Sequence, residues 1–216
     1  MLILLPPSEA KNQPTKSLKI KLSELSFFEE LTPTRSLLLA RHKEIDLSAI
    51  APAFNVYSGV LYRALDYTSL TKEARKRANK DLLIISAAFG LLRLGDEIPF
   101  YKFKIEPILW KKDIERALKG YDERLVVDAR SSTYSTVWTP NPFNSVGIRV
   151  FTKVKGQLKV ITHMSKKTRG EVVRYLLESE KEPRTPRELH QLINKKFTCK
   201  LVEPEGKKSW FIDVIA

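Results

Sequence analysis

The sequence is poor in the residues that build disulfides and metal sites. Its single cysteine, Cys199, excludes an internal disulfide, and a reducing cytoplasm is the simplest compartment for such a chain. It has only three histidines and contains neither a cysteine cluster nor a His-Glu-x-x-His run, so nothing indicates a zinc site. We therefore expect no metal and no cofactor.

Long apolar runs are also absent from the sequence. None approaches the roughly 20 residues that a membrane-spanning helix needs. The first ten residues, MLILLPPSEA, lack the basic n-region, the full h-region and the small-residue cleavage site of a signal peptide. We therefore expect a cytoplasmic protein with no membrane partner.

Positive charge, in contrast, is abundant. The chain has 38 Lys and Arg residues against 25 Asp and Glu residues, which gives a formal net charge of +13. Such a charge predicts attraction to polyanions such as nucleic acid. A solvated basic surface and the steering of a small anionic substrate are alternatives that charge by itself does not separate.

The apolar pattern is typical of a globular α/β protein. At 216 residues and 43% hydrophobic content, the chain predicts a single compact domain over residues 1–216. The short apolar runs LILL (2–5), LLIIS (82–86) and LVVDA (125–129) predict buried strands. Strand-like runs on both sides of Lys155-Gly156-Gln157, and again between 199 and 216, predict two hairpins. Helices are predicted at 23–31, 33–44, 71–79, 108–119, 166–178 and 186–196. The expected fold class is α/β (mixed α+β), with a mixed, partly parallel sheet flanked by helices.

Polar side chains follow four of the apolar runs, the fourth being KVITH (159–163). If these four strands are parallel neighbours in one sheet, their carboxyl ends converge where open α/β sheets bind ligands. Ordinary turn chemistry is the alternative for each loop taken alone. The polar residues concerned are Ser8, Glu9 and Lys11 after the first run, Arg93, Asp96 and Tyr101 after the second, and Arg130, Ser131, Ser132 and Tyr134 after the third.

The predicted helix at 166–178 carries cations where a helix disfavours them. Lys166, Lys167 and Arg169 fall in its first predicted turn, where cations oppose the helix dipole. At about 100° per residue, Lys166 and Arg169 lie on the apolar stripe of this helix, whereas Lys167 and Arg174 lie to one side. A bound anion would compensate both cations on the stripe. Extension of the two side chains into water, or pairing with Glu9 or Asp128, would also do so.

Candidates for catalysis are less well marked, and whether the protein is an enzyme stays open. Glu9, Asp128 and Lys166 are the candidate catalytic residues, and Glu9, Asp96 and Asp128 could form a carboxylate pair or bind Mg²⁺. A salt bridge with the nearby cations is the alternative role for each acid. No Gly-x-Ser-x-Gly, P-loop or Gly-x-Gly-x-x-Gly run occurs. Four tyrosines among basic residues could stack on bases, namely Tyr57, Tyr62, Tyr101 and Tyr134.

Four segments together resemble the YaaA family, which is associated with bacterial peroxide stress. They are LILLPPSEAK (2–11), AFNVYSGVLYRALD (53–66), ISAAFGLLRLGDEIPFYKF (85–103) and ITHMSKKTRGEVVRYLL (161–177), and KKTRG is the most specific part. The resemblance spans nearly the whole chain. It implies an intracellular protein with a single compact mixed α/β fold and double-stranded DNA-binding activity. The positions that match the family pattern are the Ser8–Lys11 loop, Gly90, Leu92, Arg93, Tyr101, Lys166, Lys167, Arg169 and Gly170.

The chain departs from the better-known branch of that family in two places. DNA binding there is tied to a helix-hairpin-helix with a glycine turn, but residues 31–52 of this chain contain no glycine. Close approach of a backbone to phosphate normally uses glycine, so this chain makes that contact differently or lacks it. Its start also places a carboxylate, Glu9, where that branch has none.

Three functional hypotheses follow, in this order. The first is a DNA-binding protein of the peroxide stress response, whose basic, anion-binding cleft holds backbone phosphates. The second is an enzyme that acts on a nucleotide, a nucleoside or another anionic small metabolite in the same cleft. The third is a non-catalytic structural or partner-binding protein whose charge confers solubility. The expected anion or nucleic-acid contacts are Ser8, Lys11, Arg93, Tyr101, Ser132, Lys166, Lys167 and Arg169.

Overall fold

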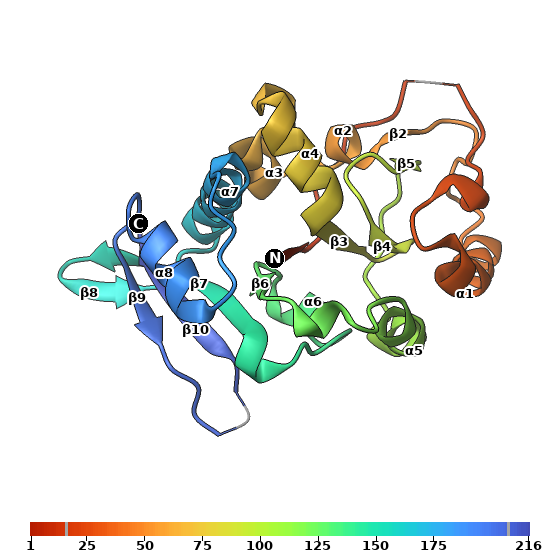
Figure 1. The fold of residues 1–216 in the computed structure, drawn as a ribbon. Helices are drawn as coiled ribbons and strands as arrows, with labels where there is room; N and C mark the ends of the chain where they lie inside the picture. The colour runs from red at the N-terminus through yellow and green to blue at the C-terminus, as the bar shows by residue number, and fades with distance from the viewer. Residues whose placement is uncertain (16, 207) are drawn as a thin grey trace.

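The computed structural model describes residues 1–15, 17–206 and 208–216 of the chain. Eight strands of this described part form one mixed sheet (Figure 1). In spatial order they are β4 (Gly90–Leu92), β3 (Leu82–Ser86), β1 (Leu2–Leu5), β6 (Val126–Asp128), β7 (Ser145–Val154), β10 (Trp210–Ile215) and β9 (Cys199–Val202), with β8 (Gln157–Lys159) paired to β7. Two short strands, β2 (Ala51–Pro52) and β5 (Glu97–Ile98), pair separately.

The centre of the sheet is parallel, as the fold prediction required. Strands β3, β1, β6, β7 and β10 run in the same direction, and the first three are the predicted strands at 2–5, 82–86 and 125–129. All four side chains of β1 are fully buried. Strands covered on both faces bury every side chain, which is why these segments appear as continuous apolar runs.

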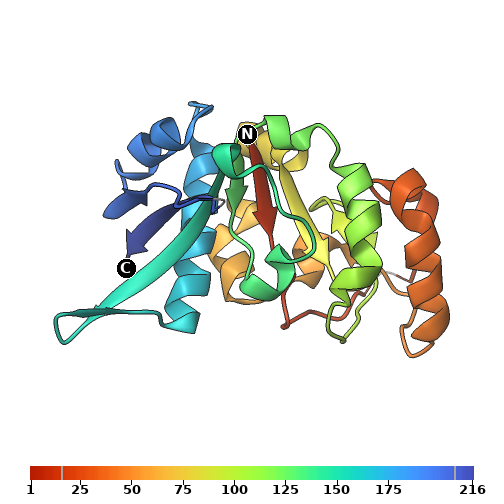
Figure 2. The same ribbon diagram turned by 90° about the horizontal axis from the view of Figure 1, so that it is seen from below.

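Helices cover both faces of the sheet (Figures 1 and 2). On one face lie α3 (Val60–Leu65), α4 (Lys72–Asp81) and α7 (Thr162–Glu178); on the other lie α5 (Pro107–Ala117) and α6 (Ser132–Ser135). Helix α1 (Phe28–Arg41) packs on α5 beside β4, α8 (Pro186–Ile193) packs beside α7, and α2 (Ala53–Val56) precedes α3. Short 3-10 turns occupy Leu22–Glu24, Tyr67–Ser69, Tyr121–Glu123 and Pro142–Asn144. No helix in the described ranges has the length and apolar content to cross a membrane.

The predicted division of the first helical region is wrong. Instead of helices at 23–31 and 33–44, the chain forms a 3-10 turn at Leu22–Glu24 and one helix, α1, that continues through Pro33. Proline removes one backbone hydrogen bond from a helix. Burial of Leu31, Arg35 and Leu38 on α1 outweighs that loss. The helices predicted at 71–79, 108–119 and 186–196 are confirmed as α4, α5 and α8, with shifted ends.

The segment KVITH is not the fourth parallel strand, because β7 takes that place. Strand β7 turns back through Lys155 and Gly156, whose φ angles are 49° and 81°, into the short exposed strand β8. Two positive φ values are typical of a tight hairpin turn, so the first predicted hairpin is confirmed. The pairing of β9 with β10 confirms the second.

Helix α7 consequently begins at Thr162, one turn earlier than predicted. Lys166 and Arg169 therefore lie beyond its first turn. The free N–H groups of that turn belong to residues 162–164, because the Ser165 N–H donates to the Ile161 carbonyl at 2.8 Å. Ser165 is no cap, since its buried hydroxyl lies 3.4 Å from the Val150 carbonyl oxygen. The predicted placement of these cations in the first turn of the helix is thus wrong.

Candidate functional site

A cavity of about 610 Å³ lies where the chain leaves the carboxyl ends of β1 and β6. Its walls come from five parts of the chain that are far apart in sequence. Figure 2 shows β1 and β3 pointing to the same edge of the sheet, so the loops that follow them are neighbours there. The walls consist of residues 6–11 after β1, 59–63 at the start of α3, 101–104 after β5, Ser131 and Tyr134 after β6, and Lys166 and Arg169 of α7. The predicted convergence of loops is therefore observed for β1 and β6.

The loop after β1 is fastened to the start of α3. The Gly59 N–H donates to Ser8 Oγ at 2.9 Å, and the Tyr62 hydroxyl donates to the Pro6 carbonyl at 2.7 Å. A Cβ atom added to Gly59 would lie 2.2 Å from Ser8 Oγ. Glycine at 59 therefore permits this contact, and the hydroxyl of Ser8 is used in the scaffold of the site.

A chain of hydroxyl groups holds Tyr101 in the wall. Its hydroxyl lies 2.9 Å from the Tyr57 hydroxyl and 2.9 Å from Ser86 Oγ at the end of β3. Ser86 Oγ also accepts the N–H of Phe89. Burial raises the pKa of Tyr57 and of Tyr101, so both phenols are neutral at physiological pH. The ring of Tyr101 thus has a fixed position at the end of the parallel strands.

Lys11 places its amine over that ring. Its Nζ lies 4.3 Å from the centre of the Tyr101 ring and 5.7 Å from the centre of the Tyr57 ring. The backbone of Lys11 forms an isolated β-bridge with Tyr57, which fixes the start of the side chain. Burial lowers the pKa of the Lys11 amine to about 8, and the charge of Glu9 acts in the opposite direction.

Helix α7 contributes Lys166 and Arg169 to the cavity wall, as the helical wheel predicted. Arg169 Nε donates to the Ile148 carbonyl at 3.0 Å, which anchors the guanidinium. Burial lowers the pKa of Arg169, and the charge of Asp128 opposes that shift. The other two cations of the helix are paired elsewhere. Lys167 lies 3.6 Å from Glu171, and Arg174 bonds to the chain at residues 65–69 and to Glu178.

Three of the expected contact residues do not line this cavity, namely Arg93, Ser132 and Lys167. Arg93 donates to the carbonyl oxygens of Asn79 and Lys80, which lie just before β3. It is placed there because β4 runs antiparallel to β3 and returns the chain toward the other edge of the sheet. Ser132 is an exposed residue of α6, next to the lining residue Ser131.

The acidic residues do not form a carboxylate pair. Both oxygens of Asp128 accept from Arg130, with Nε–Oδ1 at 2.8 Å and Nη2–Oδ2 at 2.7 Å. Asp96 accepts from the backbone of Arg93 and from Ser26, and it does not line the cavity. Glu9 alone of the three lines the cavity. Across the described ranges, no group of three or more His, Cys, Asp or Glu residues could hold a metal ion.

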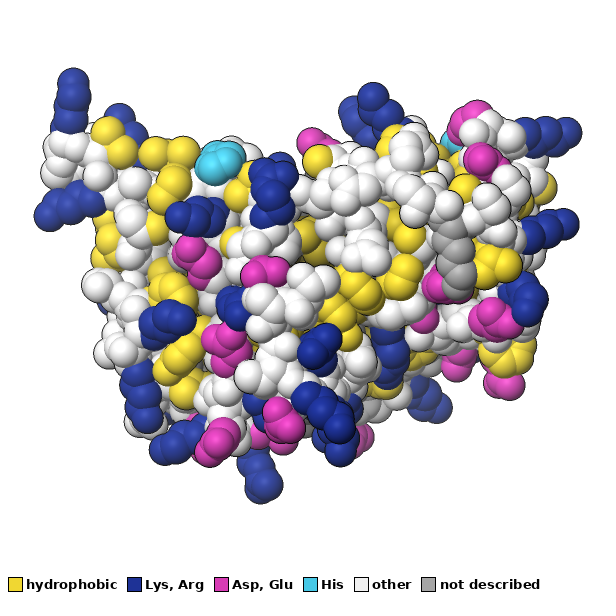
Figure 3. Space-filling view, turned by 90° about the horizontal axis from the view of Figure 1, so that it is seen from above, with side chains coloured by type: hydrophobic (Ala, Val, Ile, Leu, Met, Phe, Trp, Pro, Cys, Tyr) yellow, Lys and Arg dark blue, Asp and Glu magenta, His cyan; other side chains and the backbone are white. Residues whose placement is uncertain are grey.

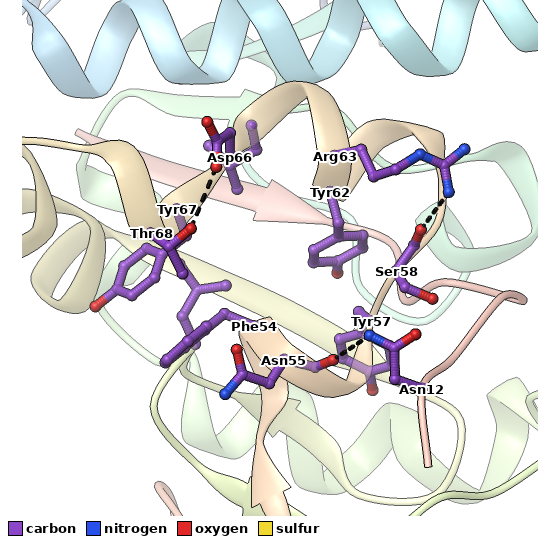
Figure 4. A pocket seen from close by; sticks show the side chains of 12 residues that line it. Asn12, Phe54, Asn55, Tyr57, Ser58, Tyr62, Arg63, Asp66, Tyr67 and Thr68 are labelled. Carbon is purple, nitrogen blue, oxygen red and sulfur yellow. Dashed lines mark hydrogen bonds between the residues drawn. The ribbon is translucent and has the colours of Figure 1, made fainter. Parts of the chain in front are cut away.

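A smaller cavity of about 220 Å³ adjoins the main one and shares Tyr62 and Arg63 with it (Figure 4). Its polar groups are largely turned toward neighbouring backbone. Arg63 Nη1 donates to the Ser58 carbonyl at 2.7 Å, and Asn12 Nδ2 donates to the Asn55 carbonyl at 2.9 Å. Arg63 is thereby held between the two cavities.

The sequence patterns did not point to Gly59, Arg63, Lys102 or Lys104 as lining residues. The segment that contains Gly59 and Arg63 forms a six-residue helix that was not predicted. One signal did include three of them. Gly59 and Arg63 lie in segment 53–66, and Lys102 lies in segment 85–103, both of which carry the family resemblance; Lys104 lies in neither. Resemblance of a segment, however, does not show which of its side chains share a cavity.

The basic residues are not gathered on one side of the molecule's upper face. Figure 3 shows Lys and Arg side chains spread across that face, with Asp and Glu side chains between them. The described residues therefore form no continuous basic stripe on that face. The cavity is a local concentration of cations. Among the described residues, one acid, Glu9, shares its lining with six cations: Lys11, Arg63, Lys102, Lys104, Lys166 and Arg169.

Comparison with known proteins gives a consistent result along the chain. The family model described as peroxide stress protein YaaA matches residues 32–201. A UPF0246 protein from Streptomyces coelicolor is 29% identical, over 100% of this chain and 98% of its own length. A UPF0246 protein from Corynebacterium efficiens is 34% identical, over 88% of this chain and 90% of its own length. An uncharacterized protein from Campylobacter jejuni is 27% identical, over 96% of each chain.

Proposed function

The chain belongs to the YaaA family of peroxide stress proteins, and from this membership we propose that it binds double-stranded DNA through the cations of its main cavity. In this proposal Lys166 and Arg169 contact backbone phosphates, and Lys11 lies in the same cavity. Phosphate contacts of this kind supply most of the affinity of proteins for nucleic acid and are independent of base sequence.

The observation that carries the proposal is the pairing pattern along α7. Lys167 and Arg174 both have acidic partners on or near the helix. Lys166 and the terminal nitrogens of Arg169 line the cavity and make no hydrogen bond or ion pair with the part of the chain that the structure describes. An anion would satisfy these donors, and a phosphate matches the fork of an anchored guanidinium.

The structure of residues 31–52 also supports placing the DNA contact at the main cavity. Residues 31–52, every one of which the structure describes, contain most of α1 and the strand β2 but no second helix. A helix-hairpin-helix contact to phosphate is therefore not available in this segment. The proposed DNA contact is accordingly assigned to the cavity.

Salt-titrated binding to duplex DNA tests the proposal. The logarithm of the binding constant should fall linearly with the logarithm of the salt concentration, with a slope near −0.9 per phosphate contact. The double variant Lys166→Ala/Arg169→Ala should bind more weakly, and its slope should be shallower by about 2 units because two contacts are lost.

A matched control is Lys167→Ala/Arg187→Ala, which removes one lysine and one arginine that lie outside the cavity and have acidic partners. This control should keep nearly the wild-type slope. Salt-insensitive DNA binding by the wild type, or the same loss in both double variants, would contradict the proposed location.

An enzyme that acts on a nucleotide, a nucleoside or another small anion is the second candidate. The cavity volume of about 610 Å³, with aromatic walls and several cations, favours it. Of the candidate catalytic residues, Glu9 and Lys166 line the cavity, whereas the oxygens of Asp128 are occupied by Arg130. Saturable binding of free nucleotides, with little affinity for duplex DNA, would favour this candidate over the first.

A further inference from the structure

Lys11 is an amine in an aromatic cavity without a carboxylate partner among the described residues. Its Nζ lies over the Tyr101 ring at 4.3 Å, and Glu9 on the same loop acts on it only through longer-range charge. The hydroxyl of Tyr101 is engaged with Tyr57 and Ser86, so it does not bond to the amine. The remaining charged groups of the lining are all cations: Arg63, Lys102, Lys104, Lys166 and Arg169.

This environment favours the neutral form of the amine. Burial disfavours the ammonium ion and lowers the pKa of Lys11 to about 8. With that pKa, roughly one-tenth of Lys11 is a free amine at pH 7, against less than about one in a thousand for an ordinary lysine. A neutral lysine is a nucleophile toward carbonyl compounds.

We propose that Lys11 captures the aldehyde of a phosphorylated sugar as an imine, while Lys166 and Arg169 hold its phosphate. The inference rests on the proposed binding of phosphate at this cavity, and it names the chemical class of the bound group. Nucleic acid that has lost a base contains such a group, because the open-chain form of the exposed 2-deoxyribose is an aldehyde between two phosphates. A free sugar phosphate has the same chemistry.

The reaction needs no oxidant or reductant. The lone pair of Lys11 Nζ forms a bond to the carbonyl carbon, and the electrons of the C=O π bond move to the oxygen. Proton transfer from nitrogen to oxygen then gives a neutral carbinolamine. A proton from solvent on the hydroxyl, followed by loss of water, gives the protonated imine. In total, the aldehyde, the amine and one proton are converted to the iminium ion and one molecule of water.

The position of the amine suits the charged product as well. An iminium ion at the Lys11 nitrogen remains over the face of Tyr101, where a cation is attracted by the ring. Tyr101 cannot rotate away without breaking its hydrogen bonds to Tyr57 and Ser86. The ring is therefore present both before and after the bond forms.

Borohydride trapping tests this inference. The full chain is incubated with 2-deoxyribose 5-phosphate, or with a DNA duplex that contains one abasic site, and sodium borohydride reduces any imine to a stable secondary amine. Peptide mapping by mass spectrometry should place the adduct on Lys11. Trapping should rise with pH around a midpoint near 8, and Lys11→Arg should lower it at least tenfold.

Two comparisons make the result specific. Lys166→Ala/Arg169→Ala should lower the trapping of 2-deoxyribose 5-phosphate about tenfold and leave the trapping of 2-deoxyribose, which has no phosphate, unchanged. Lys167→Ala should change neither. Preferential trapping of the abasic duplex identifies nucleic acid as the source of the aldehyde, and preferential trapping of the free compound identifies a metabolite.

The inference is overturned if the wild-type adduct is spread over several surface lysines, or if a folded Lys11→Arg variant is trapped as well as the wild type. The wild-type map decides the matter even where a variant fails to fold. Salt-sensitive DNA binding without trapping at Lys11 would overturn this inference and leave the proposed DNA binding intact. Trapping of the free sugar phosphate at Lys11 without DNA binding would support this inference and overturn the proposed DNA binding.

Discussion

Ser8 and Gly59 approach each other so closely that a single added carbon would not fit between them. The Gly59 N–H donates to Ser8 Oγ at 2.9 Å, and a Cβ on Gly59 would lie 2.2 Å from that oxygen but 3.4 Å from the Cβ of Ser8. This contact joins the loop after β1 to the start of α3, which are two walls of the main cavity. The conflict thus involves only the hydroxyl group.

Gly59→Ala should therefore destabilise the protein by about 1–3 kcal/mol, as overpacking does. Ser8→Ala should cost about 0.5–1.5 kcal/mol for one hydrogen bond. In the double variant Ser8→Ala/Gly59→Ala the clashing oxygen is gone. Its loss in the free energy of unfolding should therefore be smaller than the sum of the losses of the two single variants. Urea unfolding of the four proteins measures this coupling, and strict additivity would show that the contact is not the cause.

Gly170 in α7 should also be intolerant of an added Cβ. Replacing it with alanine should destabilise the protein, although the same replacement usually stabilises a helix. Alanine normally stabilises a helix interior by about 1 kcal/mol relative to glycine. Here an added Cβ would lie 2.3 Å from the Leu61 carbonyl oxygen of α3, and a backbone atom cannot move aside cheaply. Gly170→Ala should thus destabilise by about 1–3 kcal/mol in urea unfolding.

Gly95 provides the control for that substitution. A Cβ added there meets no atom within 4 Å among the described residues, and its φ is not positive. Gly95→Ala should be neutral or stabilising by up to about 1 kcal/mol. A Gly170→Ala variant as stable as Gly95→Ala would mean that α3 and α7 can separate at no cost.

Arg130 should be necessary for the stability of the chain after β6. Its fully buried side chain pairs with Asp128 and also donates to the carbonyls of Tyr134 and Trp138. Arg130→Met leaves the Asp128 carboxylate without its partner, which should destabilise by about 3–5 kcal/mol. Thermal or urea unfolding measures the effect.

Lysine should not substitute well at 130, because a single ammonium group cannot bond to two carbonyls and both carboxylate oxygens in these positions. Combining Asp128→Asn with Arg130→Met should recover part of the loss, since no unpaired charge then remains. A double variant that is no better than Arg130→Met would show that the carbonyl contacts dominate.

Lys11 should make stability depend on pH above neutrality. Its pKa is about 8 in the folded state and near 10.4 in an unfolded chain, so the unfolded chain binds more protons between these values. Its contribution therefore opposes folding below about pH 8 and fades as pH rises toward 10.4. Relative to Lys11→Met, the wild type should gain stability over this window, and NMR titration of the lysine side chains should find one midpoint near 8. A Lys11 midpoint near 10.4 would contradict the described burial of the amine.

The local pattern of the sequence was sufficient for several features of the molecule. Continuous apolar runs marked the three central strands, because strands buried on both faces have no polar side to display. The 3.6-residue period separated Lys166 and Arg169 from Lys167 and Arg174, because side-chain direction along a helix depends only on spacing. Four segments of the sequence predicted the family, and the match of the family model to residues 32–201 confirms it.

Other features depended on tertiary contacts that no local pattern contains. The antiparallel return of β4 moved Arg93 away from the cavity, and pairing with Arg130 occupied the oxygens of Asp128. The hairpin before α7 set the start of that helix one turn early. Residue type and spacing determined which groups could bind an anion. The direction of each strand and the partner of each charge, which involve residues distant in sequence, decided which of them share one cavity.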